Sequence, residues 1–188
     1  IMKKYLWILA AAFLLQACSK DEEEGPYVPW RPGDDKEETI DLDKATKVMI
    51  LTEQAKNRIV MIDQPTGKVA WEWTAADSGL SAAEQAWFDL PDEAKPVYNR
   101  TCVLVTASGG GVALIRIADK KAMFYAKPGG NPHSAEVLPD GNVVVASSTG
   151  NLLSVYVYNG ADSYVSRPAF TMPVHSAHNV VWDRKRGC

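Results

Sequence analysis

The feature that most constrains the fold of this chain is a repeated rhythm of short hydrophobic runs. Such runs alternate with polar turns along residues 45–188, and a His-Ser-Ala tripeptide at 133–135 returns forty-two residues later at 175–177. A period of about 40–50 residues is typical of the four-stranded blades of a β-propeller. The sequence therefore predicts an all-β fold, a partial β-propeller with about three to four blades.

A β-sandwich is the alternative architecture, because it also contains many short strands separated by turns. The propeller is preferred because the spacing and the residues repeat together. The expected strands are 48–52, 58–63 and 69–73 in the first blade, 102–107, 112–117 and 122–126 in the second, and a short strand within 136–142, then 143–146 and 152–158, in the third.

One segment, 81–88, is expected to be helical, because Ser81 suits the N-cap position and Glu84 follows three residues later. Near the C-terminus, residues 178–183 are predicted to form the first strand of a further blade, with 184–187 as its turn. A closed propeller needs four or more blades. We therefore expect residues 45–188 to be the N-terminal blades of a truncated propeller.

The segment 63–73, Asp-Gln-Pro-Thr-Gly-Lys-Val-Ala-Trp-Glu-Trp, resembles the Asp-x-x-Thr-Gly-Lys-x-x-Trp blade motif of quinoprotein-like propellers. By this resemblance Asp63 ends a strand, Thr66 and Gly67 form the hairpin turn, and Trp71 packs between blades. The later segments keep the strand rhythm but lack the motif. Quinone-dependent dehydrogenases share this motif with non-catalytic scaffold lipoproteins of the outer-membrane assembly type.

Residues 131–142 resemble an uncharacterised Bacteroides-type propeller lipoprotein family, and the likeness covers most of residues 45–188. Such families carry no assigned activity, so the resemblance implies fold and location rather than chemistry. A quinone-dependent dehydrogenase would need a cofactor pocket with calcium ligands, and the sequence displays no such set. No cofactor is predicted.

The N-terminus has the pattern of a bacterial lipoprotein signal peptide, residues 1–17. Two lysines precede an apolar run at 5–15 that is too short to span a bilayer, which takes about 20 apolar residues. The run ends in Leu-Gln-Ala-Cys, which resembles a lipobox and predicts lipidation, such as palmitate, on Cys18. The chain is thus expected in the cell envelope, held to the membrane by its N-terminal lipid.

Residues 18–44 are predicted to form a disordered tether, since they combine a charged run with several prolines and glycines. The acidic run at 20–24 resembles the surface-export signal of Bacteroides-type lipoproteins, which implies the outer membrane and display at the cell surface. The alternative interpretation of this run is a solvated linker.

The composition narrows the expected partners and the roles of the cysteines. The formal net charge is −3, so nothing favours nucleic acid as a partner. Cys102 is expected to be a small buried residue in a strand. Whether it pairs with Cys188 stays open, because two cysteines do not define a disulfide framework.

All three histidines fall in the repeated segments, where blade entries face the central channel of a propeller. They could bind a metal together with a carboxylate, act as a general base or nucleophile, or hydrogen-bond neighbouring blades as structural groups. The structural role is preferred, and the identity of any metal stays open. The candidate channel and ligand-binding residues are His133, Ser134, Glu136, His175, His178, Asn99 and Arg100.

The sequence favours a binding or scaffold propeller over an enzyme, because only the histidines suggest chemistry and a fold does not imply a function. The expected ligand is a small molecule, a glycan or a protein at the channel or rim. The alternative function is a channel-histidine enzyme, a transferase or hydrolase that acts on a small or carbohydrate-like substrate.

Overall fold

The computed structural model describes residues 37–187 of this chain. The predicted signal peptide, Cys18, the acidic run and Cys188 lie outside the described residues. Within residues 37–187, no helix is long and apolar enough to cross a membrane. This part of the chain is all-β and contains three antiparallel sheets, as the sequence predicted.

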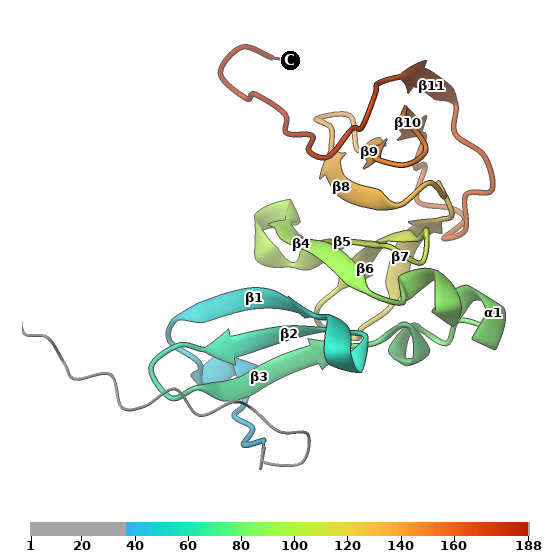
Figure 1. The fold of residues 1–188 in the computed structure, drawn as a ribbon. Helices are drawn as coiled ribbons and strands as arrows, with labels where there is room; N and C mark the ends of the chain where they lie inside the picture. The colour runs from blue at the N-terminus through green and yellow to red at the C-terminus, as the bar shows by residue number, and fades with distance from the viewer. Residues whose placement is uncertain (1–36, 188) are drawn as a thin grey trace, which may run out of the picture. The chain divides into compact units, whose positions relative to one another are not determined.

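The strands follow the chain from one sheet to the next (Figure 1). Sheet 1 contains β1 (Val48–Glu53), β2 (Arg58–Asp63) and β3 (Lys68–Trp73). Sheet 2 contains β4 (Pro91–Val97), β5 (Cys102–Ala107), β6 (Val112–Arg116) and β7 (Ala122–Ala126). Sheet 3 contains β8 (Pro132–Val137), β9 (Val143–Ser147), β10 (Leu152–Tyr156) and β11 (Phe170–Pro173).

The helical segments are short. The one α-helix within residues 37–187 is α1 (Ala82–Gln85), and Ser81 caps it as predicted, with a reciprocal bond from the Ser81 amide to Glu84. The 3₁₀ turns described are η1 (Leu42–Lys44), η2 (Gln54–Lys56), η3 (Ala75–Ser78), η4 (Ala86–Phe88) and η5 (Tyr98–Arg100).

Several parts of the chain differ from the sequence prediction. The first strand of sheet 2, β4, was not predicted, because its two prolines and four charged or small residues do not resemble a hydrophobic run. The strand predicted at 178–183 is wrong, since these residues have no regular secondary structure. The tether is predicted to extend to residue 44, whereas residues 38–40 pair with β3 through a parallel bridge.

The β2–β3 hairpin shows the local chemistry that the blade motif implied. Asp63 is 2% exposed at the end of β2, and its carboxylate accepts bonds from the Thr66 hydroxyl (2.6 Å) and the Thr46 amide (3.0 Å). Gly67 adopts a positive φ of 68°, and its amide donates to the Asp63 carbonyl. The Trp71 indole then donates to the carbonyl of Ile117 in the second repeat (3.0 Å), so it joins two sheets as expected.

Sheet 2 is buried on both faces, because its side chains alternate between two cores. Val103 and Val105 of β5 face sheet 1, with Ile59, Trp71 and Trp73 in the same cluster. Cys102 and Leu104 of β5 face sheet 3, with Val143, Val145 and Tyr156. The alternation explains why all six residues of β5 are buried, and it confirms Cys102 as a buried strand residue.

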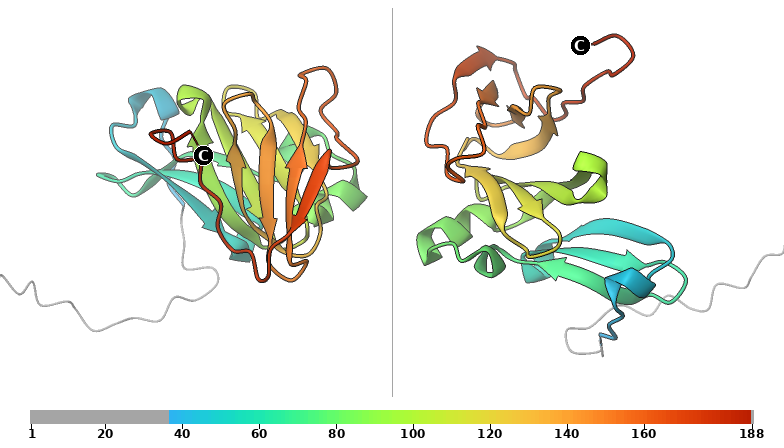
Figure 2. Two further views of the ribbon diagram at one scale, coloured as in Figure 1. Left: turned by 90° about the horizontal axis from the view of Figure 1, so that it is seen from above. Right: turned by 180° about the vertical axis from the view of Figure 1, so that it is seen from behind.

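The first strands of the three sheets lie beside one another. β1 contacts β4, and β4 contacts β8, while the views from above and from behind show the sheets following one another in chain order (Figure 2). In a propeller, the first strand of each blade lines the axis. Polar residues on β4 and β8 are therefore placed next to the position of the central channel.

Candidate functional site

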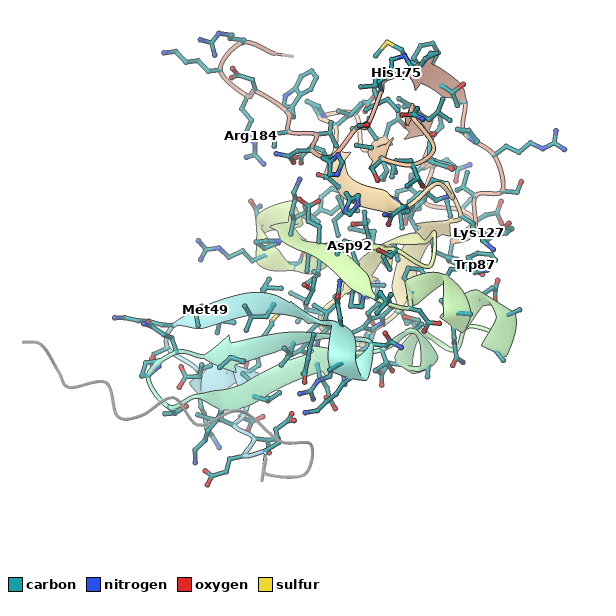
Figure 3. The ribbon with its side chains drawn as sticks, viewed as in Figure 1. Met49, Trp87, Asp92, Lys127, His175 and Arg184 are labelled. Atoms are coloured by element: carbon teal, nitrogen blue, oxygen red, sulfur yellow. The ribbon has the colours of Figure 1, made fainter. Side chains whose placement is uncertain are left out.

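A polar cluster connects the first strands of sheets 2 and 3 with the segment that follows β11. We call it the axial cluster; its members are Glu93 and Lys95 of β4, Ser134 of β8, and Asn179 and Val180. Figure 3 shows the side chains, with Asp92 of β4 labelled beside this region. The axial cluster includes Ser134, the middle residue of the first His-Ser-Ala tripeptide. Its other members lie outside that tripeptide.

Ser134 is the centre of the axial cluster and is 1% exposed. Its hydroxyl lies 3.0 Å from Oδ1 of Asn179 and 3.2 Å from Oε1 of Glu93, so it can donate to either. The same oxygen accepts from the Val180 amide (3.2 Å) and from Lys95 Nζ (3.3 Å). Buried hydroxyls need such partners, and here the partners come from two separate stretches of chain, β4 and the segment after β11.

Lys95 and Glu93 tie the same stretches together through charged groups. Lys95 Nζ donates to the carbonyls of Ala135 (2.9 Å) and Val180 (3.1 Å) and lies 3.2 Å from the Glu93 carboxylate. Glu93 also accepts from the Ala135 amide (3.0 Å). Every hydrogen of the Lys95 ammonium thus has a partner inside the fold. This arrangement supports β8 against β4 rather than offering a group to a ligand.

His133 lies at the start of β8. Its ring has a protein neighbour beside each of its two nitrogens and a third neighbour on one face. Nε2 lies 3.0 Å from the Asn131 amide nitrogen, and Nδ1 lies 3.8 Å from the Asp92 carboxylate. The ring stacks on His178, with centroids 4.7 Å apart and planes inclined by 15°. His178 Nδ1 in turn lies 2.6 Å from the carbonyl of Ser176. The structure therefore brings these two histidines together.

His175 does not join them. It is exposed in the turn after β11, and Figure 3 shows it well apart from Asp92. The two His-Ser-Ala tripeptides are consequently not equivalent. Ser134 is a strand residue, whereas Ser176 has a left-handed φ of 51° and is exposed. Within residues 37–187, no group of three or more His, Cys, Asp or Glu side chains is arranged to hold a metal ion.

The remaining candidates divide between two pockets. Asn99 and Glu136 line a pocket of about 460 Å³ at the ends of β4 and β8. Arg100 lines a different, largely apolar pocket of about 630 Å³ between sheets 1 and 2. The structure thus places Asn99 and Glu136 at one pocket and Arg100 at the other. The lining residues of the smaller pocket are Val97, Tyr98, Asn99, Glu136, Val137, Leu138, Pro139, Trp182 and Arg184.

The sequence reasoning missed the β4 contributions, Asp92, Glu93 and Lys95. β4 pairs with β5 on one side only, so its prolines remove no shared ladder bond on the axial side. One signal could have found it. The repeat period counted back from His133 falls on residue 91, where β4 begins.

Comparisons with solved structures identify the fold. The chain is similar to the WD40 β-propeller domain of Doa1, with a TM-score of 0.50 and 12% identity over 73% of this chain and 39% of that one. It is also similar to hydrazine synthase of Kuenenia stuttgartiensis, with a TM-score of 0.50 and 18% identity over 78% and 41%. At these identities the likeness shows a propeller-like fold alone.

A protein of unknown function from Bacteroides caccae matches with a TM-score of 0.48 and 18% identity, over 72% of this chain and 47% of that one. The chain spans less than half the length of each of these three structures. No curated protein matches the sequence. One family model, described as a family of unknown function (DUF6528), matches residues 2–188.

Proposed function

This chain belongs to DUF6528, a family of unknown function, and we propose that it is a lipid-anchored protein of the bacterial cell envelope with a binding or scaffold propeller. The propeller-like fold is compatible with many functions, so the proposal depends on the site rather than the fold. The location depends on the sequence of residues 1–24, with Cys18 as the lipid-bearing residue and the acidic run as the signal for surface display.

One observation carries the preference for binding over catalysis: the polar groups of the axial cluster are engaged with the protein itself. A general base needs a free nitrogen within reach of a substrate proton. His133 Nε2 is within hydrogen-bond distance of Asn131 (3.0 Å), the Asp92 carboxylate lies 3.8 Å from Nδ1, and His178 covers one face of the ring. His133 and His178 thus support the contact between β8 and the segment after β11.

The anchor is tested by replacing Cys18→Ala in cells grown with labelled palmitate. Loss of the acceptor thiol should abolish the label and leave an unprocessed precursor. Cys102→Ala is the matched control, because Cys102 is buried in β5 and should not affect labelling. A Cys18→Ala protein that still takes up label would overturn the proposed anchor.

A further inference from the structure

The pocket at the ends of β4 and β8 differs from the axial cluster in the state of its polar groups. It is bounded by the η5 turn, by the chain after β8, and by Trp182 and Arg184 of the C-terminal segment. Within residues 37–187, no hydrogen bond engages the side chains of Asn99, Trp182 or Arg184. Figure 3 shows Arg184 extending from the C-terminal segment toward the side on which β4 ends.

One wall of the pocket is held in an uncommon backbone conformation. Tyr98, Asn99 and Arg100 have φ values of 48°, 53° and 67°, so three successive non-glycine residues are left-handed. The turn is closed by Thr101, whose amide and hydroxyl both donate to the Tyr98 carbonyl (3.2 and 2.7 Å). Left-handed residues normally occur singly, and strained backbone clusters at ligand sites. Here the turn places Asn99 in the pocket wall.

Arg184 gives the pocket a basic group that can bind an anionic ligand. Glu136 is the acidic group in the lining, and its carboxylate lies 3.9 Å from Lys95 Nζ, which also lies 3.2 Å from the Glu93 carboxylate and so offsets the charge of Glu136 only in part. Asp183, beside the pocket, pairs with Arg186. Arg184 has no ion-pair partner among residues 37–187, so its guanidinium remains available to a carboxylate, which it can bind through two parallel bonds.

The other lining groups suit a ring that is apolar on its faces and carries hydroxyls at its edge. Tyr98 and Trp182 supply aromatic surface, and Leu138 and Pro139 supply aliphatic surface. The Asn99 amide can both donate and accept hydrogen bonds, and the Glu136 carboxylate can accept them. The pocket can therefore donate to the hydroxyls of a sugar and accept from them. A volume of about 460 Å³ lies in the range of small-molecule sites.

We propose that this pocket binds a carbohydrate that carries a carboxylate, of the uronic acid type, with Arg184 on the carboxylate and Asn99 on the ring hydroxyls. The inference rests on the proposed binding function and names its ligand class. It assigns the binding to the ends of β4 and β8 rather than to the histidine repeat.

The experiment is calorimetric titration of the full chain with a glucuronate oligosaccharide and with a glucose oligosaccharide of the same length. The acidic sugar should bind and the neutral sugar should bind at least about ten-fold more weakly, since a charged hydrogen bond is worth about one factor of ten or more. Arg184→Gln should lower the affinity for the acidic sugar about ten-fold.

Two further variants separate binding from folding. Asn99→Gly removes the amide but keeps a residue that accepts a left-handed φ, so it should weaken binding while the melting temperature stays unchanged. Arg167→Gln is the matched control, because Arg167 is exposed, forms no ion pair within residues 37–187 and does not line the pocket, and the affinity of this variant should equal that of the parent.

Three results would overturn the inference: no binding of the acidic sugar, equal affinity for both sugars, or binding that neither Arg184→Gln nor Asn99→Gly weakens. None of these three results would contradict the proposed lipid anchor, because the palmitate experiment at Cys18 tests it separately. Loss of palmitate labelling in Cys18→Ala together with absent sugar binding would leave the envelope proposal standing and reject the ligand class alone.

Discussion

Ser134 and Ser176 occupy the same place in two copies of one tripeptide, yet their surroundings have little in common. Ser134 is buried where β4, β8 and the segment after β11 meet, and its hydroxyl has partners on β4 and in the segment after β11. Ser176 is exposed in a turn, and its amide rather than its hydroxyl is bonded, to the side chain of Asn151. The contribution of each serine to stability therefore depends on the groups with which it forms hydrogen bonds.

This difference predicts unequal effects of the same substitution. Ser134→Ala should lower the free energy of unfolding by about 1–3 kcal/mol, because the half-buried Val180 amide and Glu93 carboxylate each lose a partner. Ser176→Ala is the matched control and should change it by less than about 0.5 kcal/mol, as exposed substitutions usually do. Urea unfolding of both variants measures the effect, and equal losses would contradict the assignment of Ser134 to the axial cluster.

At the scale of elements, the outer edges of sheets 1 and 2 are both covered by a short parallel segment. Residues 38–40 pair with β3, where Val69 donates to the Glu38 carbonyl (2.9 Å) and Ile40 donates back to Val69 (2.9 Å). Residues 163–165 pair with β7 through Tyr125 in the same way. Covered edges cannot pair with other chains, so these segments protect the strands that would otherwise be open.

The segment on β3 is held in place by ion pairs. Arg58, 8% exposed on β2, donates to both carboxylate oxygens of Glu37 at 2.7 and 2.8 Å. Lys68 pairs with Glu38 at 2.8 Å. Hydrogen bonds from Arg58 and Lys56 lower the pKa of Glu37 from 4.5 to about 2. The ionised carboxylate is thus favoured by the folded state.

We expect acid to release this segment before the sheets unfold. Because the folded pKa of Glu37 lies below its unfolded value, its contribution is complete above pH 4.5 and disappears as the pH falls toward 2. The hydrogen-exchange protection factor of the Ile40 amide should fall between pH 5 and pH 2.5. Glu37→Gln should show the weaker protection already at pH 5; a protection factor that is independent of both pH and this variant would contradict the role of Glu37.

At the scale of the whole described unit, sheet 2 contributes to two cores. Its residues alternate between the cluster shared with sheet 1 and the cluster shared with sheet 3. Phe124 of β7 is fully buried in the second cluster and packs edge-on against Tyr156 and Tyr158 at about 5.9 and 5.8 Å between ring centroids. Because sheet 2 also contributes residues to the first cluster, a loss of packing around Phe124 should destabilise that cluster as well.

Phe124→Ala should lower the free energy of unfolding by about 3–5 kcal/mol, the usual loss for a buried phenylalanine. Hydrogen-exchange protection in sheet 1 should fall together with that in sheet 3, because sheet 2 links both cores. Phe170→Ala on β11 is the matched control, since Phe170 is 56% exposed and should cost far less. Unchanged protection in sheet 1 would show that the two cores unfold independently.

Elements whose cause is local can be predicted from the sequence alone. The hydrophobic runs of β2, β3, β5 and β9 form strands where the pattern predicted them, because short hydrophobic runs bounded by polar turns favour strands. The cap at Ser81 and the turn at Asp63 are likewise made by groups a few residues apart. The all-β, propeller-like architecture could be predicted from these local features.

The tertiary structure alone decided which polar residues meet. β4 becomes a strand because β5 supplies its ladder partners, and nothing in its own prolines and charges predicts this. Ser134 becomes buried because Lys95 and Val180, 39 and 46 residues away along the chain, converge on it. His175 is excluded because its tripeptide lies in a turn. Contacts between distant residues depend on how the sheets pack, and a repeat in the sequence specifies only similar strands, not similar neighbours.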